Sequence, residues 1–206
     1  MGVKEPSTRR RSPADVRDAC RSAVIAEMTE QGLGRLSVEG VARRAGVAKT
    51  SIYRHWPSVE DLLLDALAEA LPVEQVSPKG DALRSDLLRS LEQLVGWLDG
   101  PTAPVVTMIL AERQRRPDLV EALYTRVFDT HGKRFTRTVI EHYAARGIVD
   151  HGLLTPVVVD IGEALVLKHQ IDTGKPPDTD ALIAIVDQAI LPALGHPPSH
   201  REGSPT

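Results

Sequence analysis

The sequence predicts an all-α protein, in which an N-terminal three-helix domain precedes a C-terminal helical bundle, with about nine helices in all. Apolar residues recur at intervals of three and four along most of the 206 residues, as they do on the buried face of a helix. No segment shows the two-residue alternation of a half-buried strand. No internal repeat of about 20–50 residues is present either. Breaks rich in Pro and Gly then set the bounds of each helix.

The first helices are predicted from their caps and breaks. One begins near Pro13 and ends at about Glu30, before two closely spaced glycines. The next covers 38–45, with Ser37 as its N-cap and Gly46 as its C-cap. Its apolar face consists of Val38, Val41, Ala42 and Ala45.

A short helix follows at once and carries the most informative residues of the chain. Ile52 gives it an apolar underside, and the residue before Pro57 ends it. Its outer face is cationic, hydroxylic and aromatic. Two short helices joined through Gly46 form a helix-turn-helix, and the second has side chains suited to a DNA groove.

The segment AGVAKTSIYRHWPSVEDLL closely resembles the DNA-binding signature of the tetracycline-repressor (TetR/AcrR) family. The preceding AVIAEMTEQGLGRLSVEGVARR is similar to the first two helices of that family, so the resemblance covers roughly residues 14–68. It implies a transcriptional regulator, most often a repressor, that binds double-stranded DNA as a homodimer. It also implies release from a pseudo-palindromic operator by a small-molecule effector, with no enzymatic activity and no cofactor.

The candidate DNA-binding residues are Ser37, Arg44, Lys49, Thr50, Ser51, Tyr53, Arg54 and His55. Lys49 can reach guanine or a phosphate, and the sequence leaves both open. Arg54 is equally consistent with a contact to a phosphate and with exposure to solvent. Arg44 is equally consistent with a contact to DNA and with a solvated charge on the face of its helix. At two positions the sequence departs from the family pattern and lacks a side chain that would contact the DNA backbone. Val59 replaces a common lysine, and Ala48 replaces a common serine.

The charge is distributed unevenly along the chain. Residues 1–57 hold 11 Lys/Arg against 6 Asp/Glu, whereas residues 58–206 hold 14 against 22, consistent with the overall −3. A basic end on an acidic body orients a molecule toward a polyanion. We expect a disordered basic arm at 1–12, the helix-turn-helix domain at 13–60, an effector-binding and dimerisation domain at 61–195, and a disordered tail at 196–206.

The remaining helices are predicted near 58–71, 81–99, 103–115, 118–146, 156–173 and 178–194. The last two are apolar on more than one stripe, which indicates burial on two sides. By the resemblance, they would form a four-helix bundle with their symmetry mates; the alternative is a monomer in which they are merely central. The candidate dimer residues are Val158, Ile161, Leu165, Ile183, Val186 and Ile190.

A stripe of aromatic and histidine side chains along 118–146 suggests an effector pocket, although each residue taken singly fits an ordinary core. The candidates are Trp97, Met108, Tyr124, Phe128, His131, Phe135 and His142. Ligand cavities are mostly apolar with a few convergent polar groups, and this set has that mixture. Among carboxylates, only Glu112 and Glu163 are expected near such a pocket.

Other classes of protein find little support. The chain has no phosphate-binding Gly-rich loop and no HExxH motif, and its histidines match no metal-ligand spacing. No apolar run approaches the roughly 18 residues of a membrane span, and the N-terminus lacks the apolar segment of a secretory signal. The single Cys20 fits a reducing cytoplasm. The rival functions are a non-specific DNA-binding architectural protein and, more remotely, an all-α metal-dependent enzyme.

Overall fold

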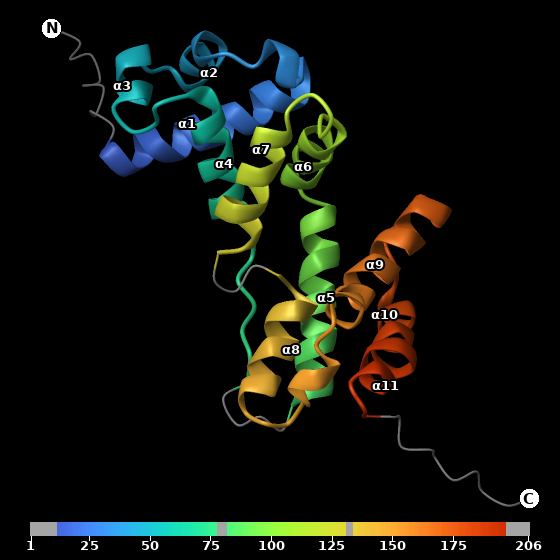
Figure 1. The fold of residues 1–206 in the computed structure, drawn as a ribbon. Helices are drawn as coiled ribbons and strands as arrows, with labels where there is room; N and C mark the ends of the chain where they lie inside the picture. The colour runs from blue at the N-terminus through green and yellow to red at the C-terminus, as the bar shows by residue number, and fades with distance from the viewer. Residues whose placement is uncertain (1–11, 78–81, 131–133, 197–206) are drawn as a thin grey trace, which may run out of the picture. The chain divides into compact units, whose positions relative to one another are not determined.

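The computed structural model describes residues 12–77, 82–130 and 134–196, and these ranges contain helices and no strand (Figure 1). The predicted all-α class is therefore confirmed. The predicted arm up to residue 11 and the predicted tail from 197 lie outside the described residues. The contacts divide the chain into two compact units. Unit 1 runs to Ala70 and includes Pro104–Arg126, whereas unit 2 comprises Leu71–Ala103 and the chain from Val127 onward. Within the described ranges, no individual helix has the length and hydropathy of a membrane span.

Unit 1 is built on α1 (Pro13–Gln31), which packs against α2 (Val38–Ala45) and α4 (Val59–Ala70). It also contains the 3-10 turn η1 (Leu33–Arg35), α3 (Lys49–Tyr53), most of α6 (Thr102–Ala111), and α7 (Pro117–Leu123). Ser12 caps α1 in a reciprocal pair with Asp15, so the predicted start near Pro13 is confirmed. Ser58 caps α4 by accepting the backbone N–H of Asp61 at 3.0 Å.

Unit 2 is a bundle formed by α5 (Leu83–Leu98), α8 (Thr136–Ala145), α9 (Pro156–Thr173) and the chain that follows. A 3-10 turn, η3 (His151–Leu153), precedes α9. The last helix is continuous through α10 (Thr179–Ile185), a π-helical turn (Val186–Ile190) and α11 (Leu191–Ala193). Its core contains Leu87, Leu91, Ile140, Tyr143, Val166 and Val186.

The predicted single helix over 118–146 is wrong. After α7 the chain forms a π-helical turn (Tyr124–Phe128), and α8 begins only at Thr136. Between them Phe135 adopts φ 43° and ψ −116°, which a helix does not allow. The buried carboxylate of Glu74 accepts the backbone N–H of Phe135 at 2.7 Å, and thus replaces the carbonyl that a continuous helix would supply.

A buried carboxylate ties the α4–α5 connector to the bundle of unit 2. Asp86, 1% exposed, accepts hydrogen bonds from the backbone N–H of Ser77 at 2.7 Å, its hydroxyl at 2.8 Å and the Tyr143 hydroxyl at 2.8 Å. Arg89 pairs with the same carboxylate. Burial alone would raise the pKa of Asp86, but the hydrogen bonds from Ser77 and Tyr143 outweigh it and lower the pKa.

Candidate nucleic-acid interface

The turn between α2 and α3 fixes the direction of the third helix. Ser37 accepts the backbone N–H of Gly40 at 3.1 Å and begins α2. At the other end Gly46 adopts the left-handed conformation, φ 66° and ψ 41°, and the N–H of Val47 returns to the carbonyl of Ala42 at 3.1 Å. A second bond joins the Gly46 N–H to the Arg43 carbonyl at 3.4 Å, which completes a Schellman motif. The local sequence thus accounts for the turn, as predicted.

Arg44 is occupied by an ion-pair cluster between α1 and α2. Its guanidinium forms two bonds with Glu30, at 2.9 and 2.5 Å, and a third with the buried Glu27 at 3.3 Å. Gly40 permits this arrangement, since a Cβ there would lie 1.9 Å from the Glu27 carboxylate. The hydrogen bonds from Arg44 lower the pKa of Glu30. Arg44 is therefore a clamp between two helices, which neither interpretation of it from the sequence foresaw.

The outer face of α3 is exposed and its inner face is buried. Lys49, Thr50, Tyr53, Arg54 and His55 are exposed, and Ser51 is half-buried. Ile52 is fully buried and holds the helix against the rest of unit 1, which confirms its expected place in the core. Tyr53 is 54% exposed, an unusual position for an aromatic side chain without a ligand. The arrangement leaves cationic, hydroxyl and phenol groups accessible on one short helix.

Trp56 anchors the end of this helix. Its ring is 6% exposed, and its indole N–H donates to the Asp65 carboxylate of α4 at 3.0 Å. The same carboxylate oxygen accepts from Arg21 of α1 at 2.9 Å. Asp65 therefore joins α1, the end of α3 and α4 through one side chain. Trp56 is thus a buried residue at the end of α3, and its polar partner on α4 was not predicted from the sequence.

Glu39 is a residue of this surface that the sequence did not reveal. It lies in the first turn of α2, and its carboxylate accepts a hydrogen bond from the Lys49 ammonium at 2.7 Å. The hydrogen bond from Lys49 lowers the pKa of Glu39, and the same bond raises the pKa of Lys49. Helical periodicity carries no signal for this contact, because the two residues belong to different helices.

The predicted effector residues are divided between the two units. Met108 and Tyr124 belong to unit 1, whereas Trp97, Phe135 and His142 belong to unit 2. Phe128 lines a cavity of unit 2. His131 lies outside the described residues. The ring centroids of Trp97 and Phe135 are 6.2 Å apart. The Trp97 Nε1 and His142 Nε2 atoms are buried and make no hydrogen bond within the described part of the chain. Because α7 and α8 are separate helices, the expected single aromatic stripe does not exist.

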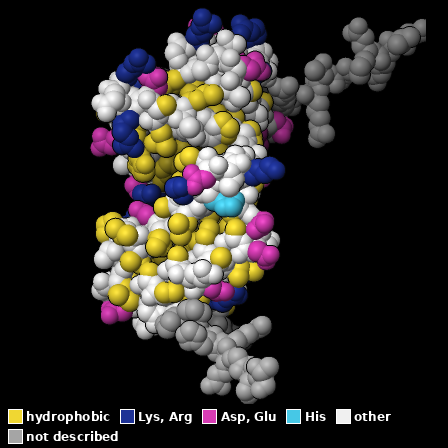
Figure 2. Space-filling model, turned by 90° about the vertical axis from the view of Figure 1, so that its right-hand side faces the viewer, with side chains coloured by type: hydrophobic (Ala, Val, Ile, Leu, Met, Phe, Trp, Pro, Cys, Tyr) yellow, Lys and Arg dark blue, Asp and Glu magenta, His cyan; other side chains and the backbone are white. Residues whose placement is uncertain are grey.

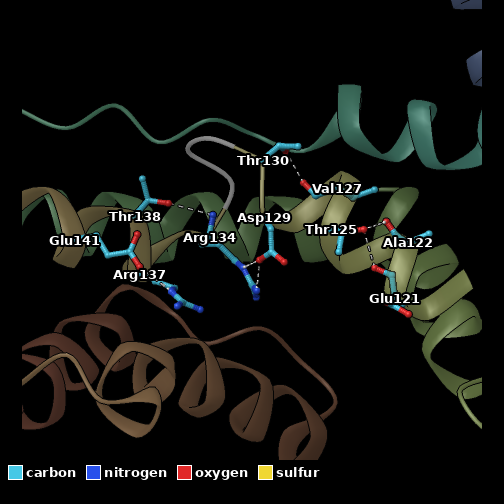
Figure 3. Close-up of polar contacts among 10 residues, drawn as sticks. All are labelled: Glu121, Ala122, Thr125, Val127, Asp129, Thr130, Arg134, Arg137, Thr138 and Glu141. Atoms are coloured by element: carbon cyan, nitrogen blue, oxygen red, sulfur yellow. Dashed lines mark hydrogen bonds and ion pairs between the residues drawn. The ribbon is translucent and has the colours of Figure 1, made fainter. Parts of the chain in front are cut away.

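A cavity of about 340 Å³ lies beside the break that precedes α8 (Figure 3). Its lining consists of Phe128, Asp129, Thr130, Arg134, Arg137, Thr138 and Glu141. Arg134 pairs with Asp129 at 2.5 Å and Arg137 with Glu141 at 2.9 Å, and both guanidinium groups project to the same side in Figure 3. Of this lining, Phe128 is the one member of the candidate effector residues given above.

Nearby on α9, burial and the charge of Asp160 raise the pKa of the half-buried Glu163 to about 7. The charges of Arg134 and Arg137 oppose that shift in the pKa of Glu163. Glu163, whose pKa lies near neutral pH, is therefore close enough to Arg134 and Arg137 to interact with their charges.

The predicted dimer residues fall into two groups. Val186 and Ile190 are fully buried in their own unit, so their assignment to an exposed interface is wrong: they form the core face of the last helix. Val158 and Ile161 pack partly against the same core, Ile183 is half-buried, and Leu165 is 37% exposed.

Three exposed apolar residues of α9 are not among the candidate dimer residues. They are Val157, Leu167 and Ile171, and they are 75%, 43% and 79% exposed. Hydrophobic side chains gather over α9 and α10 in the lower half of Figure 2. The spacing of these residues, in steps of three and four when Asp160 and Ala164 are included, is the signal that would have identified the stripe.

Comparison with known proteins agrees with this architecture. Residues 22–66 match the family model described as bacterial regulatory proteins of the tetR family, and residues 77–189 match the tetracycline repressor-like C-terminal domain. An HTH-type transcriptional regulator of Mycobacterium tuberculosis is 32% identical over 167 residues, which is 81% of this chain and 82% of that protein. The DNA-binding transcriptional repressor TetR of Mycobacteroides abscessus is 24% identical over 180 residues, 86% and 93% of the two chains.

Among solved structures, the flavonoid-responsive regulator FrrA shares the fold with a TM-score of 0.61 at 22% identity. The match covers 87% of this chain and 94% of that one. The two family models together span both the helix-turn-helix and most of the helical bundle, in the order found here. This chain is a helix-turn-helix transcriptional regulator and not an enzyme, and it belongs to the TetR family.

Proposed function

We propose that the protein is a sequence-specific repressor that binds a pseudo-palindromic DNA operator as a homodimer and is released from it by a small molecule. The observation that supports this most directly is the exposed face of α3, held in place by Ile52 and Trp56. The residues proposed to contact DNA are Lys49, Thr50, Ser51, Tyr53, Arg54 and His55, with Ser37 at the start of α2.

Arg44 is a weaker candidate than the sequence suggested, since DNA must compete with two carboxylates for its guanidinium. The hydroxyl of Ser37 is likewise engaged with the Gly40 N–H, although a hydroxyl retains a donor for a phosphate. The exposed residues of α3 therefore carry the main part of the proposal.

The homodimer follows from the size of a single recognition helix, which contacts only a few base pairs. A two-fold dimer places two such helices about 34–36 Å apart, one turn of DNA. The exposed apolar stripe of Val157, Leu167 and Ile171 on α9 provides a surface for this association. Apolar side chains exposed to this extent in a single chain are expected at an interface between subunits.

The effector is proposed to bind in unit 2. Among the described residues, the buried Trp97 Nε1 and His142 Nε2 atoms have no hydrogen-bond partner, so a ligand can satisfy them. The ring of Phe135 lies close to Trp97. Release requires the ligand to prefer the conformer that cannot span both half-sites. FrrA, a structural neighbour of this chain, is a flavonoid-responsive regulator, and flavonoids are small molecules.

Operator binding by two substituted proteins tests this function. The probe is a duplex obtained by footprinting the purified protein on its genomic DNA. Lys49→Ala and Tyr53→Phe are expected to weaken binding about 5- to 30-fold, because each removes a contact worth ~1–2 kcal/mol. Both side chains are exposed, so the melting temperature is expected to stay unchanged.

Loss of stability in these variants would instead place the two residues in the core.

The rival function, an architectural DNA-binding protein without an effector, predicts equal affinity for all sequences with a steep salt dependence. The proposed function predicts a preference of ~10³ or more for the operator over random DNA. A ratio near one would refute it.

A further inference from the structure

An ion pair between Glu39 and Lys49 lies at the N-terminal end of the recognition helix. Glu39 and Lys49 are ten residues apart in the sequence, yet the Lys49 Nζ and Glu39 Oε1 atoms are 2.7 Å apart. The two side chains are 62% and 53% exposed, so neither is held there by burial. A helix-turn-helix presents the N-terminal residues of its recognition helix to base edges. The two charges therefore enter the groove side by side.

The major-groove edge of a G·C pair is complementary to this arrangement. Guanine presents the acceptors N7 and O6, and cytosine presents the N4 amino donor. O6 and N4 are neighbours because they hydrogen-bond to each other across the pair. An ammonium group that donates one bond to Glu39 keeps two N–H donors for guanine, and a carboxylate accepts more than one bond. An A·T pair fits less well, since thymine O4 would face the carboxylate.

We propose that Glu39 is a specificity-determining residue: together with Lys49 it recognises one G·C pair in each half-site. Lys49 donates to guanine, and Glu39 accepts from the N4 amino group of the paired cytosine. This inference rests on the sequence-specific DNA binding proposed above, and it assigns a role to an acidic residue of α2 outside the recognition helix.

The negative charge of Glu39 also affects the affinity for DNA sequences that lack this base pair. A carboxylate brought to DNA is repelled by the phosphates, so Glu39 weakens binding to duplexes that offer it no donor. A base amino group at the right place, here the N4 group of cytosine, compensates for that repulsion. Glu39 therefore increases the ratio of specific to non-specific affinity, even though it lowers affinity for DNA in general.

Selection from a random duplex library tests the proposal with the full-length protein. The selected sites are compared for the wild type, Glu39→Gln, Glu39→Ala and the matched control Glu30→Gln. Glu30 is also an exposed carboxylate in an ion pair of unit 1, but it lies on α1 and pairs with Arg44. The control thus removes the same charge and the same kind of contact without changing the proposed base contact.

The wild type is expected to select a G·C pair at one symmetric position of each half-site. Replacing that pair by A·T in the selected duplex is expected to cost the wild type about tenfold or more in affinity, and Glu39→Ala about threefold or less. Glu39→Gln is expected to tolerate A·T at that position, because the glutamine amide has an NH₂ donor for thymine O4 and the carboxylate has none. Both Glu39 variants are expected to bind a random duplex more tightly at low salt, and Glu30→Gln to select the wild-type site.

Two results would overturn the inference while leaving the proposed function intact. One is a wild-type site without a shared G·C pair, and the other is identical base preferences in the wild type and both Glu39 variants. If the wild type selects no sequence at all, the proposed operator binding fails together with the inference. Melting curves identify a variant that loses its fold, and in that case the other Glu39 variant decides the result.

Discussion

Asp65 provides the sharpest test of how the recognition helix is held, because one carboxylate oxygen serves partners from two other segments. The change Asp65→Ala removes the acceptor of the Trp56 indole N–H and of the Arg21 guanidinium. Trp56 is 6% exposed, so its N–H is left unsatisfied at a cost of ~1–3 kcal/mol. Arg21 is more accessible and adds ~0.5 kcal/mol. The expected destabilisation is about 2–3 kcal/mol.

This loss corresponds to a decrease of about 4–12 °C in the melting temperature of a chain of this size. Circular dichroism measures that temperature. Hydrogen exchange of α1 and α4 shows whether the loss is confined to unit 1, since two units need not unfold together. The matched control is Glu69→Ala: Glu69 is another partner of Arg21 on α4, but its side chain is 67% exposed. We expect it to cost less than ~0.5 kcal/mol. Equal effects of the two changes would refute the assignment of Asp65 as the residue that joins α1, the end of α3 and α4.

Three further changes have distinct outcomes. Tyr143→Phe leaves Asp86 with its other partners and is expected to cost ~1–1.5 kcal/mol in urea denaturation; no change would mean that this hydrogen bond is not formed. In the folded state, burial and the charge of Asp160 raise the pKa of Glu163 from 4.5 to about 7. The free energy of unfolding is therefore unaffected by Glu163 below pH 4.5, where the carboxyl is neutral in both states, and it decreases as the pH rises through 7. Glu163→Gln is therefore expected to raise the melting temperature at pH 8 and to leave it unchanged at pH 4; equal effects at both pH values would contradict the shift. Ile171→Asp is expected to give monomers in sedimentation at micromolar concentration with an unchanged fold, and a persistent dimer would exclude this face of α9.

Local signals in the sequence were sufficient for the elements that carry the candidate interface. Ser37 and Gly46 act on backbone groups within a few residues, so the bounds of α2 were predictable. The helix predicted near 58–71 is likewise found as α4 (Val59–Ala70), with Ser58 as its cap. The third helix was expected to end at the residue before Pro57, but α3 ends at Tyr53. Exposure of the outer face of α3 followed from the single buried Ile52.

The errors arose where distant residues decide the structure. The break before α8 depends on Glu74, which is 61 residues from the N–H of Phe135 that it satisfies. Periodicity showed that the last two helices are apolar on more than one side, but not which side meets the chain itself. Val186 and Ile190 were therefore assigned to an interface although they face the core. The Glu39–Lys49 pair escaped notice for a related reason, since it crosses a turn between two helices.

The clamp formed by Arg44 with Glu27 and Glu30 has a consequence for how binding responds to ionic strength. Counterion release scales with the number of phosphates that basic side chains neutralise. A guanidinium already neutralised by two carboxylates within its own subunit contributes little to that number. We therefore expect the slope of log affinity against log salt to be shallower than the count of arginines and lysines near the helix-turn-helix would give. Discrimination between operators then depends more on base contacts than on the attraction of phosphates.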